Sequence, residues 1–294
     1  MKTSRSNMLV NLAVLIIALS FLLTNPSALF AQEFVAYSAA GIDAAAIQTV
    51  VDAFRNAVGS TNNGNTPGPL PSGRREINWD GGGAGAAAMT FPIPMTTFNT
   101  APLARGAVFS TPGTGFEISG QPTPEFGDLN ATYPGIFTTF SSPRLFTPLG
   151  SNITDVNFFR PGTDVAATTN GFGAVFTDVD LAATTSIEFF SSTGDSLGLF
   201  FVPPANNGLS FVGVVFNNER LSLVRITSGN TAPGPSESSV VDAVVMDDFI
   251  YGEPLVGPPT DADECKKGGW AEFEFPRAFK NQGDCVKFVK TGKF

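Results

Sequence analysis

Four aspartates lie in or next to the most apolar stretches of this chain, and they are the strongest candidates for chemistry. Asp178 and Asp180 end one apolar run, and Asp247 and Asp248 lie inside another. A buried carboxylate is costly unless it is paired or coordinated. Because Ca²⁺ binds groups of carboxylate oxygens, these four residues form a candidate calcium site.

These carboxylates have two alternative roles. They could cap loops or form ion pairs with arginines elsewhere in the chain: Arg160, Arg220 or Arg225. Alternatively, a carboxylate pair drawn from Asp178, Asp180 and Glu188 could catalyse polysaccharide cleavage. A glycoside hydrolase needs two such groups facing one groove, roughly 5 to 9.5 Å apart.

Strand periodicity predicts where these side chains point. In a regular strand Asp178 and Asp180 share a face with Phe176, because side chains alternate between the two faces. Asp247 and Asp248 are neighbours, so they point to opposite faces unless a β-bulge intervenes.

The chain contains no histidine. Catalysis by Ser-His-Asp or Cys-His groups is therefore excluded, as are zinc sites built on histidine. Any catalysis would have to use carboxylates, tyrosines, lysines or a hard cation. This favours a non-catalytic protein, with a carboxylate-based hydrolase or lyase as the alternative.

The distribution of charge excludes nucleic-acid binding. Residues 32–259 contain 20 Asp or Glu against 8 Arg and no Lys. A surface of this sign repels phosphate groups, which dominate the affinity of nucleic-acid-binding proteins. Residues 260–294 differ, with seven Lys or Arg against six acidic residues.

The N-terminal residues have the layout of a secretory signal peptide. Lys2 and Arg5 precede an apolar run from Met8 to Leu23, and Ala31 offers a small residue for cleavage. The apolar run is shorter than the roughly 20 residues that span a bilayer. We therefore expect a secreted, extracellular or cell-surface protein, with no transmembrane segment after cleavage. Because Leu29 occupies a position where a small residue is preferred, an uncleaved anchor is the alternative.

The remaining pattern predicts an all-β fold, a jelly-roll-type β-sandwich with one N-terminal amphipathic helix. Apolar residues three and four apart predict the helix over Ile42–Val58, with Asp43 as N-cap and Gly59 as its end, packed on the end of the sandwich. Short apolar runs separated by turns predict the strands: Ala107–Thr111, Phe116–Ser119, Arg144–Thr147, Asp155–Phe159, Gly173–Asp180, Ser186–Phe190, Leu197–Val202, Leu209–Phe216, Leu221–Thr227 and Val240–Ile250. The expected divisions are a signal peptide (1–31), a helix with a Pro/Gly/Asn-rich linker (32–73), the sandwich (74–254) and a C-terminal disulfide module (255–294).

The two cysteines of the chain, Cys265 and Cys285, are expected to form a disulfide in an exported protein. Closing a loop of this length contributes about 3 kcal/mol on a chain-entropy estimate. The aromatic residues of the same segment have two interpretations. Trp270 could stack on a sugar ring or form a small core around the disulfide.

Several motifs together resemble a group of secreted bacterial proteins of unassigned function, whose members often carry PEP-CTERM sorting tails. The motifs lie at residues 73–81 (GRREINWDG), 105–116, 171–180 and 246–253 (MDDFIYGE). The sorting tail itself is absent. The last residues, with DECKKGGW and FKNQGDCV, instead resemble a short cysteine-containing module found at the C-terminus of other exported bacterial proteins.

These observations favour a secreted or cell-surface module that binds glycan or extracellular matrix without catalysis, with structural calcium as a candidate ligand. The polysaccharide hydrolase or lyase is one alternative. A structural envelope or matrix protein that self-associates through its C-terminal module is another.

Overall fold

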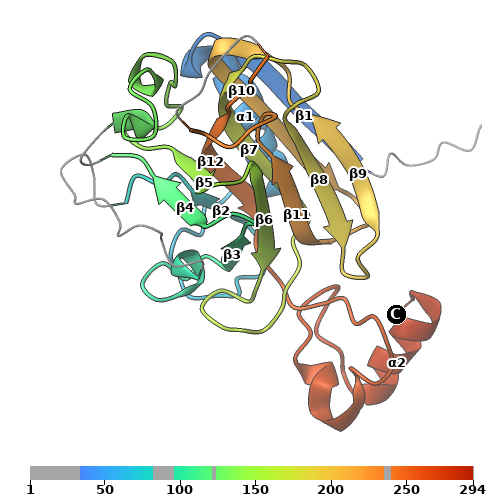
Figure 1. Cartoon of the computed structure of the whole chain (residues 1–294). Helices are drawn as coiled ribbons and strands as arrows, with labels where there is room; N and C mark the ends of the chain where they lie inside the picture. The colour runs from blue at the N-terminus through green and yellow to red at the C-terminus, as the bar shows by residue number, and fades with distance from the viewer. Residues whose placement is uncertain (1–33, 82–95, 121–123, 235–239, 294) are drawn as a thin grey trace, which may run out of the picture. The chain divides into compact units, whose positions relative to one another are not determined.

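A computed structural model describes residues 34–81, 96–120, 124–234 and 240–293. In these ranges two antiparallel sheets form a β-sandwich, which confirms the predicted fold class (Figure 1). The predicted signal peptide, residues 1–31, lies outside the described residues. Of the helices described, none has the length and apolar character needed to cross a membrane.

The described strands form one sheet of seven and one of five. The first sheet has the order β1 (Phe34–Gly41), β10 (Ala205–Phe216), β7 (Gly171–Val179), β12 (Val245–Gly252), β5 (Phe146–Leu149) and β4 (Gly115–Ile118), with β2 (Arg74–Ile77) paired to β12. The second sheet has the order β3 (Ala107–Ser110), β6 (Ile153–Phe158), β11 (Leu221–Thr227), β8 (Ser186–Ser191) and β9 (Ser196–Phe201). From β5 onward the orders β5-β12-β7-β10 and β6-β11-β8-β9 are those of a jelly roll.

Helix α1 (Ala44–Val58) covers the outer surface of the first sheet. Asp43 caps it as predicted, because its carboxylate accepts a hydrogen bond of 3.0 Å from the backbone N–H of Ala46. Its buried side chains pack against β7, β10 and β12. The helix therefore lies on a face of the sandwich, and the prediction that it packs on the end was wrong.

Two strand glycines make room for this helix. A Cβ atom on Gly173 would lie 2.9 Å from the ring of Phe54, and one on Gly213 would lie 2.8 Å from it. These distances are too short for any other residue without a shift of the ring. The glycines in the otherwise apolar β7 and β10 are thus explained by the close approach of an aromatic side chain.

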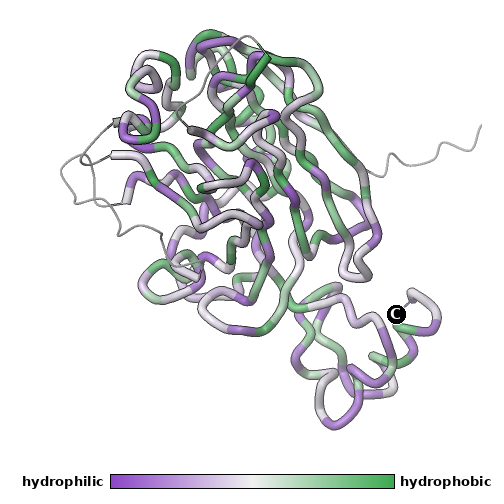
Figure 2. The backbone as a smooth tube through the Cα atoms, in the orientation of Figure 1, coloured by the Kyte–Doolittle hydropathy of each residue, from purple (hydrophilic) through white to green (hydrophobic). Residues whose placement is uncertain are grey.

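The core between the sheets is strongly aromatic, which accounts for the many phenylalanines of the sequence. Trp79 stacks on Phe146 with ring centroids 3.9 Å apart, and Phe109 and Phe249 contact both rings. Figure 2 shows the hydrophobic colour running along the strands that enclose this core. Such ring pairs stabilise the core beyond their buried area alone.

Each of the ten predicted strands is present as one of β3 to β12, although several ends differ. The strand predicted from Val240 begins at Val245, and the one predicted from Leu209 begins at Ala205. Strands β1 and β2 and the C-terminal helix α2 (Gln282–Thr291) were not predicted. Short 3₁₀ turns complete the described elements: Thr97–Asn99, Pro124–Phe126, Tyr133–Gly135 and Lys266–Ala271.

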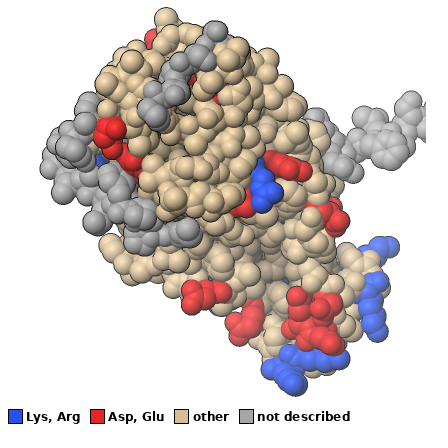
Figure 3. Space-filling model, in the orientation of Figure 1, with Lys and Arg blue, Asp and Glu red and all other residues tan. Residues whose placement is uncertain are grey.

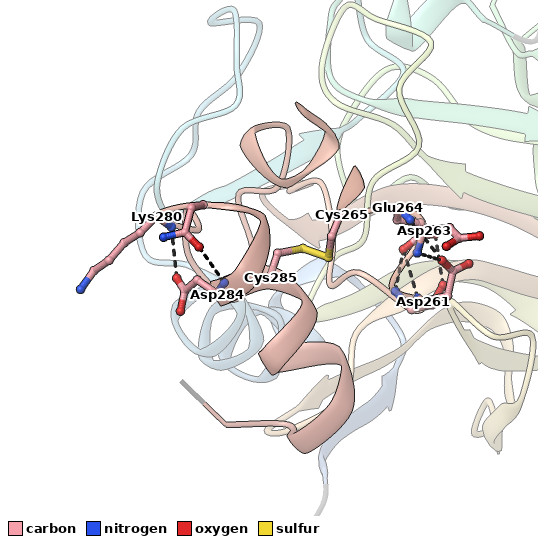
Figure 4. Close-up of a disulfide and its surroundings, with 9 residues drawn as sticks. Asp261, Asp263, Glu264, Cys265, Lys280, Asp284 and Cys285 are labelled. Carbon is pink, nitrogen blue, oxygen red and sulfur yellow. Dashed lines mark hydrogen bonds between the residues drawn. A yellow bond between two sulfur atoms is a disulfide. The ribbon is translucent and has the colours of Figure 1, made fainter. Parts of the chain in front are cut away.

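The disulfide between Cys265 and Cys285 is confirmed, and it joins α2 to the segment before it (Figure 4). Both cysteines are buried in a small cluster with Phe279, against which Trp270 packs. This contact favours the core interpretation of Trp270. Apart from Lys2, every lysine of the chain belongs to this module, and four of them are exposed along and around α2: Lys280, Lys287, Lys290 and Lys293.

A buried ion pair joins β2 to the end of β12. Arg75 and Glu253 are both almost inaccessible to solvent, and the Arg75 guanidinium donates to the Glu253 carboxylate at 2.6 and 2.7 Å. The same guanidinium donates to the backbone carbonyls of Gly64, Thr66 and Ala104. One arginine thereby holds two loop segments, one at Gly64 and Thr66 and the other at Ala104, to the sheet.

Replacing Glu253 by glutamine should destabilise the fold by about 3–5 kcal/mol, because it leaves the Arg75 cation buried without its counterion. Urea-induced unfolding of Glu253→Gln measures this loss. The matched control is Asp263→Asn, which removes an exposed carboxylate paired with Lys266 and should change the midpoint little. Equal midpoints for the two variants would contradict the role given to Arg75.

Candidate functional site

Strand β12 contains a β-bulge at the Asp247–Asp248 pair. Its register with β7 shifts between Met246 and Phe249, and both of these residues belong to the core between the sheets. The two aspartates between them therefore both face away from that core. The sequence did not decide whether a bulge occurs here. The structure contains one, so the two neighbouring carboxylates lie on the same side of the sheet.

Hydrogen-bond donors surround this carboxylate pair. Asp247 accepts from the backbone N–H groups of Phe140 and Ser141, at 2.6 and 3.2 Å. Asp248 accepts from the Ser141 hydroxyl at 2.6 Å and from the Arg55 guanidinium of α1 at 3.1 Å. The predicted role as a loop cap thus describes Asp247, whereas Asp248 forms an ion pair.

Burial changes the acidity of both groups. The pKa of Asp247 is raised well above its ordinary value, first by burial and then by the neighbouring Asp248 charge. Burial also raises the pKa of Asp248 to about 6, against the opposing effect of Ser141 and Arg55. Two adjacent buried carboxylates disfavour a second negative charge, so the pair retains a proton at a pH where exposed aspartates are ionised.

A pocket of about 350 Å³ opens beside Asp248. We call it the β2–β12 pocket, and its polar lining side chains come from segments far apart in the sequence: Arg55, Asn62, Glu76, Asn78, Arg105, Ser141 and Asp248. Strands β2 and β12 place Glu76 opposite Ile250, which brings the motifs at residues 73–81 and 246–253 together. Arg105, the first residue of the motif at 105–116, also lines the pocket. The sequence assigned no role to Arg55, Arg105 or Ser141.

Asp178 and Asp180 lie in a different environment at the end of β7. Asp178 has a positive φ of 64°, and both Phe176 and Val179 face the core, so the strict alternation predicted for this strand is broken. Asp178 accepts a hydrogen bond of 2.7 Å from the backbone N–H of Asn207. Partial burial, followed by the charge of Asp242, raises the pKa of Asp180. The sequence did not single out Asp242.

The four aspartates are thus two pairs with different partners. In the described part of the chain, no group of three or more Asp, Glu, Cys or His residues is arranged to hold a metal ion.

The arginines proposed as partners of the four aspartates bind elsewhere: Arg160 to Glu274, Arg225 to Asp155, and Arg220 to Thr168 and the Phe275 ring. Glu188 lies on β8 of the second sheet, whereas Asp178 lies on β7 of the first.

The outer surface of the second sheet is open and mixes apolar with polar side chains. We call this surface the open face, and its members are Asp155, Asn157, Glu188, Phe190, Leu199, Phe201, Leu223 and Arg225. Leu199 and Phe201 are 50% and 53% exposed. A hollow of about 520 Å³ lies over part of it, beside Phe190 and Arg225. Figure 3 shows a largely uncharged surface over the strands, with charge gathered at the C-terminal module.

Comparison with known proteins adds a fold likeness alone. No family model matches the chain. No curated protein matches it either. Among solved structures, it is similar to a family 29 carbohydrate-binding module from Piromyces equi, with 9% sequence identity and a TM-score of 0.25, over 49% of this chain and 80% of that one. A score this low transfers no ligand and no residue role to the present chain.

The raised pKa values of Asp247 and Asp248 predict how the stability of the fold depends on pH. Their folded-state pKa lies above that of the unfolded chain, so their contribution is complete below about pH 4 and declines as the pH rises through about 6. Asp247→Asn mimics the protonated acid. Its amide N–H can donate to the hydroxyl oxygen of Ser141, while its oxygen accepts from the backbone N–H groups of Phe140 and Ser141. At pH 7.5 it should therefore raise the free energy of unfolding by about 1 kcal/mol or more.

Thermal unfolding of wild type and Asp247→Asn between pH 4 and 8 measures this effect. The two curves should converge below about pH 4 and separate progressively as the pH rises above it. Asp195→Asn, at an exposed turn, serves as control. Curves that stay parallel across the range would show that the pair carries no extra proton.

Proposed function

We propose that this protein is an exported, non-catalytic module that binds polysaccharide through the open face. The observation that carries the proposal is the exposure of Phe201 and Leu199 on a sheet surface that also presents Asn157, Glu188 and Arg225. Sugar rings have apolar C–H faces and a rim of hydroxyl groups. A surface that alternates exposed apolar side chains with hydrogen-bonding groups matches both features.

The charged row across the open face supports this proposal. Arg225 donates two hydrogen bonds to Asp155 on β6, at 2.8 and 2.7 Å, and lies opposite Glu188 on β8. The two parallel hydrogen bonds orient the guanidinium and the Asp155 carboxylate across adjacent strands. Hydroxyl groups of a bound chain can donate to the carboxylates and accept from the guanidinium.

Export and group membership are part of the same proposal. A disulfide is consistent with an oxidising compartment, as expected for a secreted or cell-surface protein. The motif resemblance to secreted bacterial proteins agrees with export. A hydrolase is less favoured, because Glu188 and the pair Asp178 and Asp180 belong to different sheets.

The pair Asp178 and Asp180 suits a calcium ion better than the pair Asp247 and Asp248. At Asp247 and Asp248 the oxygens already accept from N–H groups, a hydroxyl and Arg55, whose positive charge opposes a cation. Near Asp180 the neighbouring charge is the Asp242 carboxylate, and Asp180 Oδ1 is buried without a hydrogen-bond partner among the described residues. We therefore confine the calcium proposal to Asp178 and Asp180.

Glycan arrays followed by titration with the best-binding polysaccharide test the open face. Phe201→Ala should weaken binding roughly 10- to 100-fold, the effect of losing about 1.5–3 kcal/mol of apolar contact. Ile42→Ala is the matched control, since Ile42 is an apolar residue 80% exposed outside the open face. Absence of binding to every glycan would contradict the proposed function, and equal losses in both variants would contradict the assigned surface.

Thermal unfolding with calcium and with EDTA tests the ion site. A cation that binds only the folded state should raise the unfolding midpoint, and Asp180→Asn should abolish the rise. Asp195→Asn, on the exposed β8–β9 turn, should leave it intact. No calcium-dependent shift in the wild-type protein would exclude the ion site.

A further inference from the structure

The β2–β12 pocket gathers side chains from six separate parts of the chain. Asp248 and Ser141 lie beside Arg55 of α1, and Glu76 of β2 contacts the same arginine at 2.9 Å. Asn62 and Arg105 reach the pocket from loops. A volume of about 350 Å³ lies within the range of roughly 300 to 1,000 Å³ that small-molecule sites occupy.

The two arginines of this pocket have different partners. Arg55 forms ion pairs with Asp52, Glu76 and Asp248. Arg105 donates to the side-chain oxygen of Asn65 and to the backbone carbonyl of Glu76. Among the residues that the structure describes, no carboxylate lies within ion-pair distance of Arg105. Arg105 is a half-buried cation that makes no direct ion pair with the described carboxylates, and Glu76 acts on it only through its more distant charge.

An anionic group in the pocket would give Arg105 a direct ion-pair partner. Burial disfavours the charged form of Arg105 and lowers its pKa; Tyr251 and Glu76 oppose this effect only in part, and the nearby Arg75 charge adds to it. A planar guanidinium binds a carboxylate through two parallel hydrogen bonds, which a single point charge cannot do. A carboxylate is therefore the group best matched to Arg105.

The rest of the lining matches hydroxyl groups. The carboxylates of Glu76 and Asp248 accept hydrogen bonds, and the amides of Asn62 and Asn78 can both donate and accept. A hydroxyl group also donates and accepts, so it can bridge a carboxylate and an amide. A compact ligand with one carboxylate and several hydroxyl groups satisfies both parts of the pocket.

We propose that the β2–β12 pocket binds a single sugar acid of the uronic acid class, with its carboxylate on Arg105 and its hydroxyl groups on Asp248, Glu76 and the asparagine amides. The site lies on the first-sheet side of the sandwich and shares no residue with the open face. It therefore stands whether or not the open face binds polysaccharide.

Isothermal titration of the full chain with glucuronate and with glucose tests this site, because these ligands differ only in the carboxylate. Glucuronate should bind at least tenfold more tightly than glucose, and Arg105→Gln should remove that preference. Phe201→Ala should leave both affinities unchanged, which separates this site from the open face. Equal affinities in the wild-type protein, or no binding of either ligand, would overturn the proposal.

A second variant keeps the test valid if Arg105→Gln fails to fold. Asn62→Asp retains the oxygen that accepts from the Gly64 N–H and adds a negative charge at the pocket. It should weaken glucuronate binding severalfold and affect glucose much less. Unchanged glucuronate affinity in this variant would overturn the assignment of the pocket.

Discussion

The ion pair between Arg75 and Glu253 is the constraint on which both the loops and the pocket depend. Glu253 ends β12 and also accepts hydrogen bonds from the Asn63 side chain and the Leu70 backbone. Arg75 reaches the carbonyls of Gly64, Thr66 and Ala104. The Pro/Gly/Asn-rich loop contains no helix or strand, and its one ordered pairing is an isolated β-bridge between Asn62 and Arg74. The two buried charges hold the rest of the loop and the chain before Arg105, so bridge and ion pair together place Asn62 and Arg105 beside the pocket.

The sequence predicts much of this fold, because a sandwich with one buried face per strand shows a clear period of two. Helix α1 and the disulfide were equally predictable, from apolar spacing and from cysteine count. Strand β1 was not predicted because FVAYSAAG is rich in small residues and half exposed. Strand β2 was not predicted because RREI looks like an exposed charged segment, although Arg75 is fully buried.

The candidate sites were less predictable, because they depend on departures from regular geometry. A one-residue bulge puts Asp247 and Asp248 on the same side, and a positive φ at Asp178 interrupts β7. Neither follows from periodicity. Arg55 and Asp248 are 193 residues apart, so their contact could not be inferred from spacing. The usable signal was the presence of charged residues within short apolar motifs, at residues 73–81 and 246–253, which pair as β2 and β12.

The uneven placement of lysine has a practical consequence for handling the protein. Residues 32–259 contain no lysine, whereas Lys280, Lys287, Lys290 and Lys293 are exposed along and around α2. Amine-directed reagents would therefore leave the side chains of both sheets unmodified. Coupling to an activated bead or sensor chip through these lysines would attach the molecule by its C-terminal end, with the sandwich left free in solution.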